Sequence, residues 1–136
     1  MRAHACEENG VGMFWYYANV TVHVLCAATE ERAKRLALSR NLMRLRTVRG
    51  LRAGVPPVTT AELYPYTEDE RAYLRHLSAS YIDGNPQQVK VALEAISARY
   101  QTHDIGIVTI CYDFADRLRS YALVAEVCEL KAQDTT

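Results

Sequence analysis

The chain has 136 residues, of which 49% are hydrophobic and 24% charged, and its 16 basic and 16 acidic residues balance to a net charge of zero. A balanced chain offers no electrostatic field for nucleic acid or an anionic membrane surface, and its length suits one small domain with a buried core. The sequence contains neither an apolar run of about 18 residues that would cross a membrane nor a signal-peptide layout. We therefore expect a cytoplasmic protein.

The four cysteines are scattered along the chain, at Cys6, Cys26, Cys111 and Cys128. They form neither a Cys-x-x-Cys pair nor the spacing of a zinc site, so we expect buried free thiols. His4 lies close to Cys6, but two ligand types near a terminus do not specify a metal site. No metal is expected.

The first 26 residues predict a single strand after a poorly patterned start. Residues 1–14 show no periodicity, and Gly10 and Gly12 would break any helix. Residues 15–26 are rich in β-branched and aromatic side chains, and polar and apolar residues alternate from Asn19 to Val24. One face of this strand is therefore more polar, and it carries His23.

A long helix is predicted after this strand. Thr29 precedes two glutamates, as expected of an N-cap followed by acidic residues that complement the helix dipole. Ala33, Leu36 and Ala37 belong to its apolar stripe. The opposite face is basic and is expected to be solvated, with contact to a phosphate or a partner as the alternative. Its members are Arg32, Lys34, Arg35, Arg40, Arg44, Arg46 and Arg49.

The middle of the chain predicts a loop and then a short helix. Prolines and glycines exclude regular structure through most of residues 50–65. So long a connection is often a lid or a binding loop. Thr67 and Glu70 then form a capping-box pattern that opens a helix to about Ser80.

The stretch from Tyr81 to Glu126 predicts a helix, a buried strand and a second helix. Asn85, Pro86 and Gln88 are typical of a capped helix start, and the helix is expected to reach Tyr100. Residues 105–112 show no polar alternation, so both faces of that strand should be buried in a parallel sheet. Asp113 is expected to cap the last helix, and residues 131–136 form a tail that should be frayed. The expected inner face of the last helix is Leu118, Tyr121, Ala122 and Ala125.

The expected order is thus strand, helix, loop, helix, helix, strand, helix. This alternation predicts an α/β protein with parallel strands. Two strands that are buried on both faces cannot make an independent sheet of ordinary size. The sequence therefore predicts a part of a larger parallel structure.

Three segments, in order, carry a resemblance to a known family. They are residues 16–36; Arg49-Gly50 with Val55-Pro56-Pro57 and residues 64–67; and residues 81–126, with Gly84-Asn85-Pro86-Gln87 and Arg117-Leu118-Arg119-Ser120-Tyr121. Together they resemble the C-terminal part of the bacterial-luciferase-like flavin-dependent monooxygenases. The segment before Tyr16 departs from the family pattern, as do Ala28 and Gln87. A truncated gene or one half of a split gene would fit this departure.

The resemblance implies a partial (β/α)8 TIM barrel, a fold that takes about 250 residues when complete. Residues 15–130 would supply only its last two β/α units, with the strands at 15–26 and 105–112. It also implies that reduced FMN and O2 oxygenate a small organic substrate in the complete enzyme. This chain alone is expected to lack the full flavin site, to bind no flavin tightly and to be inactive.

In a barrel of this type the active residues lie at the C-terminal ends of the strands. The candidate residues for flavin or substrate contact are His23, Arg49, Tyr112, Asp113 and Arg117. Each has a structural alternative: Asp113 as a helix cap, Arg117 as the partner of Asp113 or of Asp116, and Tyr112 and His23 as packed side chains. No catalytic residue is assigned.

A second reading makes the chain a non-catalytic assembly module. A parallel sheet with two unpaired edge strands is expected to pair with a strand of another polypeptide. It would self-associate as a homo-oligomer, or it would complete a barrel together with a separate complementary chain.

Overall fold

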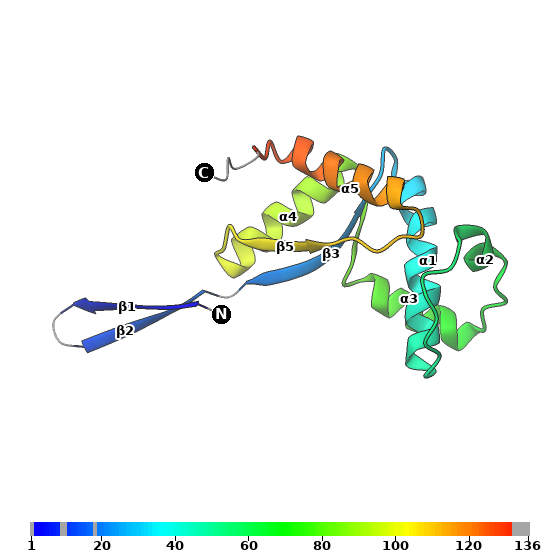
Figure 1. Cartoon of the computed structure of the whole chain (residues 1–136), viewed down its shortest axis with the longest axis horizontal. Coiled ribbons are helices and arrows are strands. Elements are labelled where there is room, and N and C mark those ends of the chain that lie inside the picture. Colours follow the sequence, from blue (N-terminus) through cyan, green and yellow to red (C-terminus); the bar gives the residue numbers. More distant parts are fainter. Residues whose placement is uncertain (1, 9–10, 18, 132–136) are drawn as a thin grey trace.

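The computed structural model describes residues 2–8, 11–17 and 19–131, with side chains from residue 19 onwards. Strands β1 (Arg2–Glu8) and β2 (Val11–Tyr17) form an antiparallel pair that runs from Arg2↔Tyr17 to Glu8↔Val11. Figure 1 shows this pair extending away from the other elements. The sequence pattern had predicted no element over residues 1–14. Pairing explains the difference, because hydrogen bonds across two strands need no alternation of side chains.

The second sheet has three parallel strands in the order β4-β3-β5. Strand β3 (Val20–Cys26) lies in the centre, and β4 (Ile82–Gly84) and β5 (Ile105–Val108) flank it. The single strand expected over residues 15–26 is thus divided between β2 and β3. Strand β4 was not expected, and β5 ends four residues earlier than expected, so the predicted strand at residues 105–112 was too long.

Five helices accompany the sheet in the described part of the chain. They are α1 (Glu30–Val48), α2 (Val58–Leu63), α3 (Glu68–Ser78), α4 (Pro86–Tyr100) and α5 (Phe114–Val127). Helix α2 lies within the segment expected to be a loop, where Pro57 immediately precedes its first turn. A proline with its fixed φ is compatible with a helix start, although it excludes a helix interior.

Both faces of the sheet carry helices. Val24 and Cys26 pack against Val89 of α4 and Val124 of α5. Leu25 points to the opposite face, where a separate cluster holds it against Ala33, Leu36 and Ala37 of α1. In Figure 1, α4 and α5 lie together on one side of β3 and β5, and α1 lies at the end of the sheet near α2 and α3.

The structure corrects the expected fold. The chain is a small α/β domain with a three-stranded parallel sheet, and the last two units of a (β/α)8 barrel are not shown. A barrel carries all of its helices on one outer face. Here the crossover from β3 to β4 and the crossover from β4 to β5 run in opposite directions along the sheet. Right-handed crossovers of opposite direction place their helices on opposite faces.

The predicted helix caps are confirmed. The side chain of Thr29 accepts a hydrogen bond from the Arg32 backbone N–H at 3.2 Å. Thr67 with Glu70, and Asn85 with Gln88, form reciprocal capping boxes. Asp113 accepts from the Ala115 backbone N–H at 2.8 Å. Each of these contacts spans two or three residues, so the sequence alone specifies it.

The expectation that the strand at residues 105–112 is buried on both faces was wrong. Ile105, Gly106 and Ile107 are half-buried, and Val108 is exposed. Strand β5 is an edge strand, and within the described residues no further strand pairs with it or with β4. An unpaired edge exposes part of an apolar strand whose composition suits a central position.

Three cysteine side chains are described, and all three are free thiols. Cys26 and Cys111 are buried and Cys128 is half-buried, as expected; the side chain of Cys6 lies outside the described residues. None of the described helices is both long enough and apolar enough to span a membrane. Across residues whose side chains are described, no group of three potential metal ligands comes together.

Candidate functional site

The structure brings three of the sequence-predicted site residues to the junction between β5 and α5. Asp113 is the cap described above, so its structural alternative is confirmed. Tyr112 is 56% exposed, and the expectation that it is packed was wrong. Arg117 was expected to pair with an aspartate, but Asp116 pairs with Arg32 from α1 at 2.8 Å.

Arg117 instead acts on Tyr121, one turn further along α5. The Thr109 backbone N–H donates a hydrogen bond to the Tyr121 hydroxyl at 3.2 Å. Burial alone would raise the pKa of Tyr121, but hydrogen bonds with Thr109 and with Arg117 outweigh it and lower that pKa below its ordinary value. Tyr121 thereby holds the end of β5 to α5.

Arg49 lies apart from this junction. It follows α1 and forms an ion pair with Glu70 of α3, whose side chain is buried. Its guanidinium also donates to the Tyr64 hydroxyl at 3.4 Å. These contacts hold the segment between α1 and α3, so Arg49 and the β5–α5 junction are not brought together.

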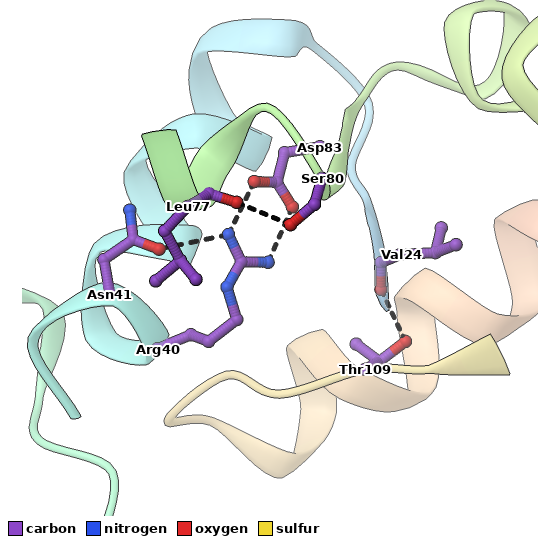
Figure 2. A network of polar contacts seen from close by, with 7 residues as sticks. All are labelled: Val24, Arg40, Asn41, Leu77, Ser80, Asp83 and Thr109. Atoms are coloured by element: carbon purple, nitrogen blue, oxygen red, sulfur yellow. Dashed lines mark hydrogen bonds and ion pairs between the residues drawn. The ribbon is translucent and has the colours of Figure 1, made fainter. Parts of the chain in front are cut away.

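His23 belongs to a charged cluster beneath α1, with Arg40 and Arg44 of that helix, Asp83 of β4, and Tyr81. The Arg40 side chain is 1% exposed and makes two hydrogen bonds to the Asp83 carboxylate, at 2.8 and 2.7 Å. Figure 2 shows this pair together with the contact from Arg40 to Asn41. The Arg40 guanidinium also stacks on the Tyr81 ring, 4.0 Å from its centre.

His23 contacts this cluster through its ring. The ring lies 4.9 Å from that of Tyr81 in an edge arrangement, and its Nε2 is 3.4 Å from an Arg44 nitrogen. Burial lowers the pKa of His23, and the charges of Arg44 and Arg40 lower it further, while Asp83 acts in the opposite direction. The structure thus confirms the structural alternative for His23, which is a packed side chain.

The pKa of His23 makes the fold sensitive to acid. Because the folded protein resists protonation of this ring and the unfolded chain does not, stability is present above the ordinary pKa of 6.5 and is lost as the pH falls below it. We expect the midpoint of urea unfolding to fall between neutral and mildly acidic pH, and to fall less in His23→Gln. The variant His76→Gln, at an exposed position of α3, should keep the wild-type dependence. Equal dependence in His23→Gln and wild type would contradict this.

The sequence pattern did not reveal the role of Arg40. It was assigned to the solvated face of its helix with six other cations, although it is among the most deeply buried side chains described. Position 40 lies three and four residues after Ala37 and Leu36, so helical spacing could have placed it on the buried face. Its partner Asp83 lies 43 residues away, on a strand that was not expected.

A crevice lies at the C-terminal end of β3. It has a volume of about 190 Å³ and is lined by Cys26, Ala27, Ala28, Arg32, Leu36, Asp116 and Arg119. The chain leaves β3 for α1 on one face of the sheet, and it leaves β5 for α5 on the other. In open α/β sheets, ligands bind where the helices diverge in this way.

Helix α5 carries a second apolar face that the described residues cover only in part. Phe114, Leu118, Tyr121 and Ala125 recur at helical spacing, and the structure buries Ser120, Leu123 and Val124 instead. Phe114 and Leu118 are 67% and 53% exposed. The bond from Thr109 to Tyr121 places this face on the side of β5. The expected inner face of α5 was therefore wrong, because Leu118 and Ala122 are exposed and Tyr121 and Ala125 are only half-buried.

Comparison with known proteins finds relatives but no family model that matches. Three uncharacterized proteins of Bacillus subtilis (strain 168) are similar: YceB is 34% identical over 79% of this chain, YwcH 37% over 80%, and YvbT 33% over 82%. The matches cover 32 to 33% of those proteins. The chain thus spans about a third of the length of the curated relatives that it matches.

A solved structure is also similar. The crystal structure of apo-MsnO8 superposes with a TM-score of 0.71 and 30% identity, over 83% of this chain and 35% of that chain. In this neighbour too, the matching segment is about a third of a longer polypeptide.

The resemblance to the bacterial-luciferase-like monooxygenases does not hold against these comparisons. No family model matches the chain, and the names of the relatives and of the solved structure state no such activity. The quoted motifs have a simpler explanation in the structure. Thr29, Asn85 with Pro86, and Asp113 are helix caps, and caps of this kind begin helices in α/β proteins generally.

Proposed function

We propose that the chain is an assembly module, in which a second copy of the chain extends the sheet across β5. The observation that carries this proposal is the second apolar face of α5 beside the open edge of β5. Tyr112, Phe114 and Leu118, which we call the apolar strip, are all exposed along the segment from the end of β5 into α5. An exposed apolar patch beside an unpaired edge is typical of an interaction surface.

The edge of β5 has none of the features that normally prevent pairing. Its sequence is Ile105-Gly106-Ile107-Val108, without a charge, a proline or a bulge. Natural edge strands are usually protected by such features. Two copies related by a two-fold axis would pair their β5 strands in antiparallel orientation and would bring both apolar strips to one interface.

An apolar groove lies beside β5 on the face of the sheet that α4 and α5 cover. It has a volume of about 310 Å³ and lies between β5, α4 and α5. Leu93, Ile105, Ile107, Val124 and Cys128 contribute its apolar lining. A partner strand at β5 would cover this groove, and the zero net charge of the chain does not oppose contact between copies.

The test is the mass of the purified chain in solution, by size-exclusion chromatography with light scattering across the micromolar range. We expect about twice the chain mass of 15.4 kDa, with a shift towards the monomer on dilution. A folded monomer throughout this range overturns the proposal. A second result would also overturn it. If the chain stays monomeric alone but associates when the remaining two-thirds of YceB is added as a separate polypeptide, the partner is a complementary chain and not a second copy.

The expected chemistry with reduced FMN stays a prediction. The similar solved structure is an apo form of MsnO8, which favours a ligand for the whole of that protein. For this chain alone we expect weak flavin binding, because it spans a third of its relatives. Titration of reduced and oxidised FMN, read by flavin fluorescence or absorbance under anaerobic conditions, should show no saturation at submicromolar concentrations. Submicromolar binding would contradict this expectation.

A cytoplasmic location belongs to the same proposal. Burial raises the pKa of Cys26 to about 11 and also raises that of Cys111. Such thiols are protonated and unreactive at neutral pH. Free buried thiols are typical of proteins in a reducing compartment.

A further inference from the structure

We propose that the crevice at the C-terminal end of β3 binds a small oxyanion, such as the phosphate group of a ligand, between Arg32 and Arg119. This inference is independent of the assembly proposal, because the apolar strip and the crevice lining share no residue. It assigns a ligand class to a cavity that is built from three separate parts of the chain, the end of β3, α1 and α5.

The floor of the crevice leaves room for a small group. Cys26, Ala27 and Leu36 are buried beneath it, and Ala28 forms its rim. The two alanines follow β3 directly, where larger side chains would fill the space. A volume of about 190 Å³ accommodates a phosphate or carboxylate group but not a nucleotide or a flavin ring.

The walls carry an excess of positive charge. Arg32 donates to Asp116 across the crevice at 2.8 Å, and this pair is neutral as a whole. Within the described residues, Arg119 makes no ion pair, and its charge reaches the floor, where it opposes the rise in the pKa of Cys26. One cation is therefore left over, and arginine binds phosphate and carboxylate oxygens in a two-pronged geometry.

The backbone adds hydrogen-bond donors. Helix α1 begins at Glu30, two residues after the rim at Ala28, and is 19 residues long. The Thr29 side chain occupies the Arg32 N–H, and the first turn of such a helix offers further N–H donors, while Glu30 and Glu31 in that turn offset the positive end of its dipole. The chemistry implied is binding alone, because the Cys26 thiol is protonated at neutral pH.

The test is titration of the full chain with inorganic phosphate at constant ionic strength, read by amide shifts in 1H–15N correlation spectra. We expect saturable shifts centred on Ala28, Arg32 and Arg119. Arg119→Gln should weaken binding about tenfold, as expected for the loss of one charge-assisted contact. Asp116→Asn should tighten it several-fold, because it releases Arg32 and removes a negative charge. Parallel titration with acetate distinguishes a phosphate ligand from a carboxylate ligand.

Arg117→Gln is the matched control, since Arg117 lies on the same helix but acts on Tyr121. It should leave the phosphate affinity unchanged. A purely structural role for the crevice would not produce opposite effects in Arg119→Gln and Asp116→Asn. Shifts spread over the whole surface, or equal affinity in wild type and Arg119→Gln, overturn the proposal.

Discussion

Replacement of Arg40 with alanine is expected to destabilise the fold by about 3–5 kcal/mol, because it leaves a buried carboxylate without its partner. Asp83 is only 12% exposed and receives both hydrogen bonds from the Arg40 guanidinium. The variant also removes the stacking on Tyr81. The free energy of unfolding of a native domain is roughly 5–15 kcal/mol. This substitution would therefore remove much of the free energy of unfolding. Urea unfolding followed by circular dichroism measures it.

Two further variants separate the buried charge from packing in general. Arg75→Ala removes an exposed ion pair with Glu68 and should cost less than about 1 kcal/mol. The double variant Arg40→Met with Asp83→Leu replaces the pair by apolar side chains and should recover most of the lost stability. A loss of under about 1 kcal/mol in Arg40→Ala would show that this pair does not hold α1 to β4.

Polar replacement of both Phe114 and Leu118 is expected to convert the associated chain into a folded monomer. Both side chains are more than half exposed in one copy, so their contribution to the fold of that copy is small. Burial of a large apolar side chain contributes about 1.5–3 kcal/mol. Loss of two such contacts at a two-fold interface would weaken association by at least about a hundredfold.

The variant Phe114→Gln with Leu118→Gln places a good helix former at both positions. Val91→Gln is the matched control, because Val91 is 56% exposed on α4 but lies outside the apolar strip. Light scattering should show a monomer for the double variant and the wild-type mass for the control. Circular dichroism should show the same helical content for all three proteins. An unchanged mass in the double variant would mean that the strip is not the interface.

Sequence reasoning located the starts of α1, α3, α4 and α5 but missed α2 and misjudged helix faces. The caps at Thr29, Thr67, Asn85 and Asp113 all hold in the structure. Their contacts are local, and so residue type and spacing decide them. The two faces of α5 both carry apolar residues, however, and periodicity alone does not say which face meets β3 and α4.

In the charged cluster, too, the pattern within one element did not predict which side chains are buried together. His23 was singled out from its position on a polar strand face, whereas Arg40 was placed among solvated cations. The environment of Arg40 depends on Asp83, and Asp83 lies on β4, a strand of three residues that is too short to show a pattern. The crevice likewise needs α1 and α5 side by side, although Arg32 and Asp116 are 84 residues apart.

The sequence by itself therefore determined the α/β character, the capped starts of four helices and the free thiols at Cys26, Cys111 and Cys128, since these follow from composition and from contacts within a turn. Only the tertiary structure decided the strand order, the burial of Arg40, the crevice at β3 and the exposed side chains of α5. Each of these depends on which distant segments meet. Long-range contacts are selected by the packing of whole elements, and the pattern within any one element is compatible with several such arrangements.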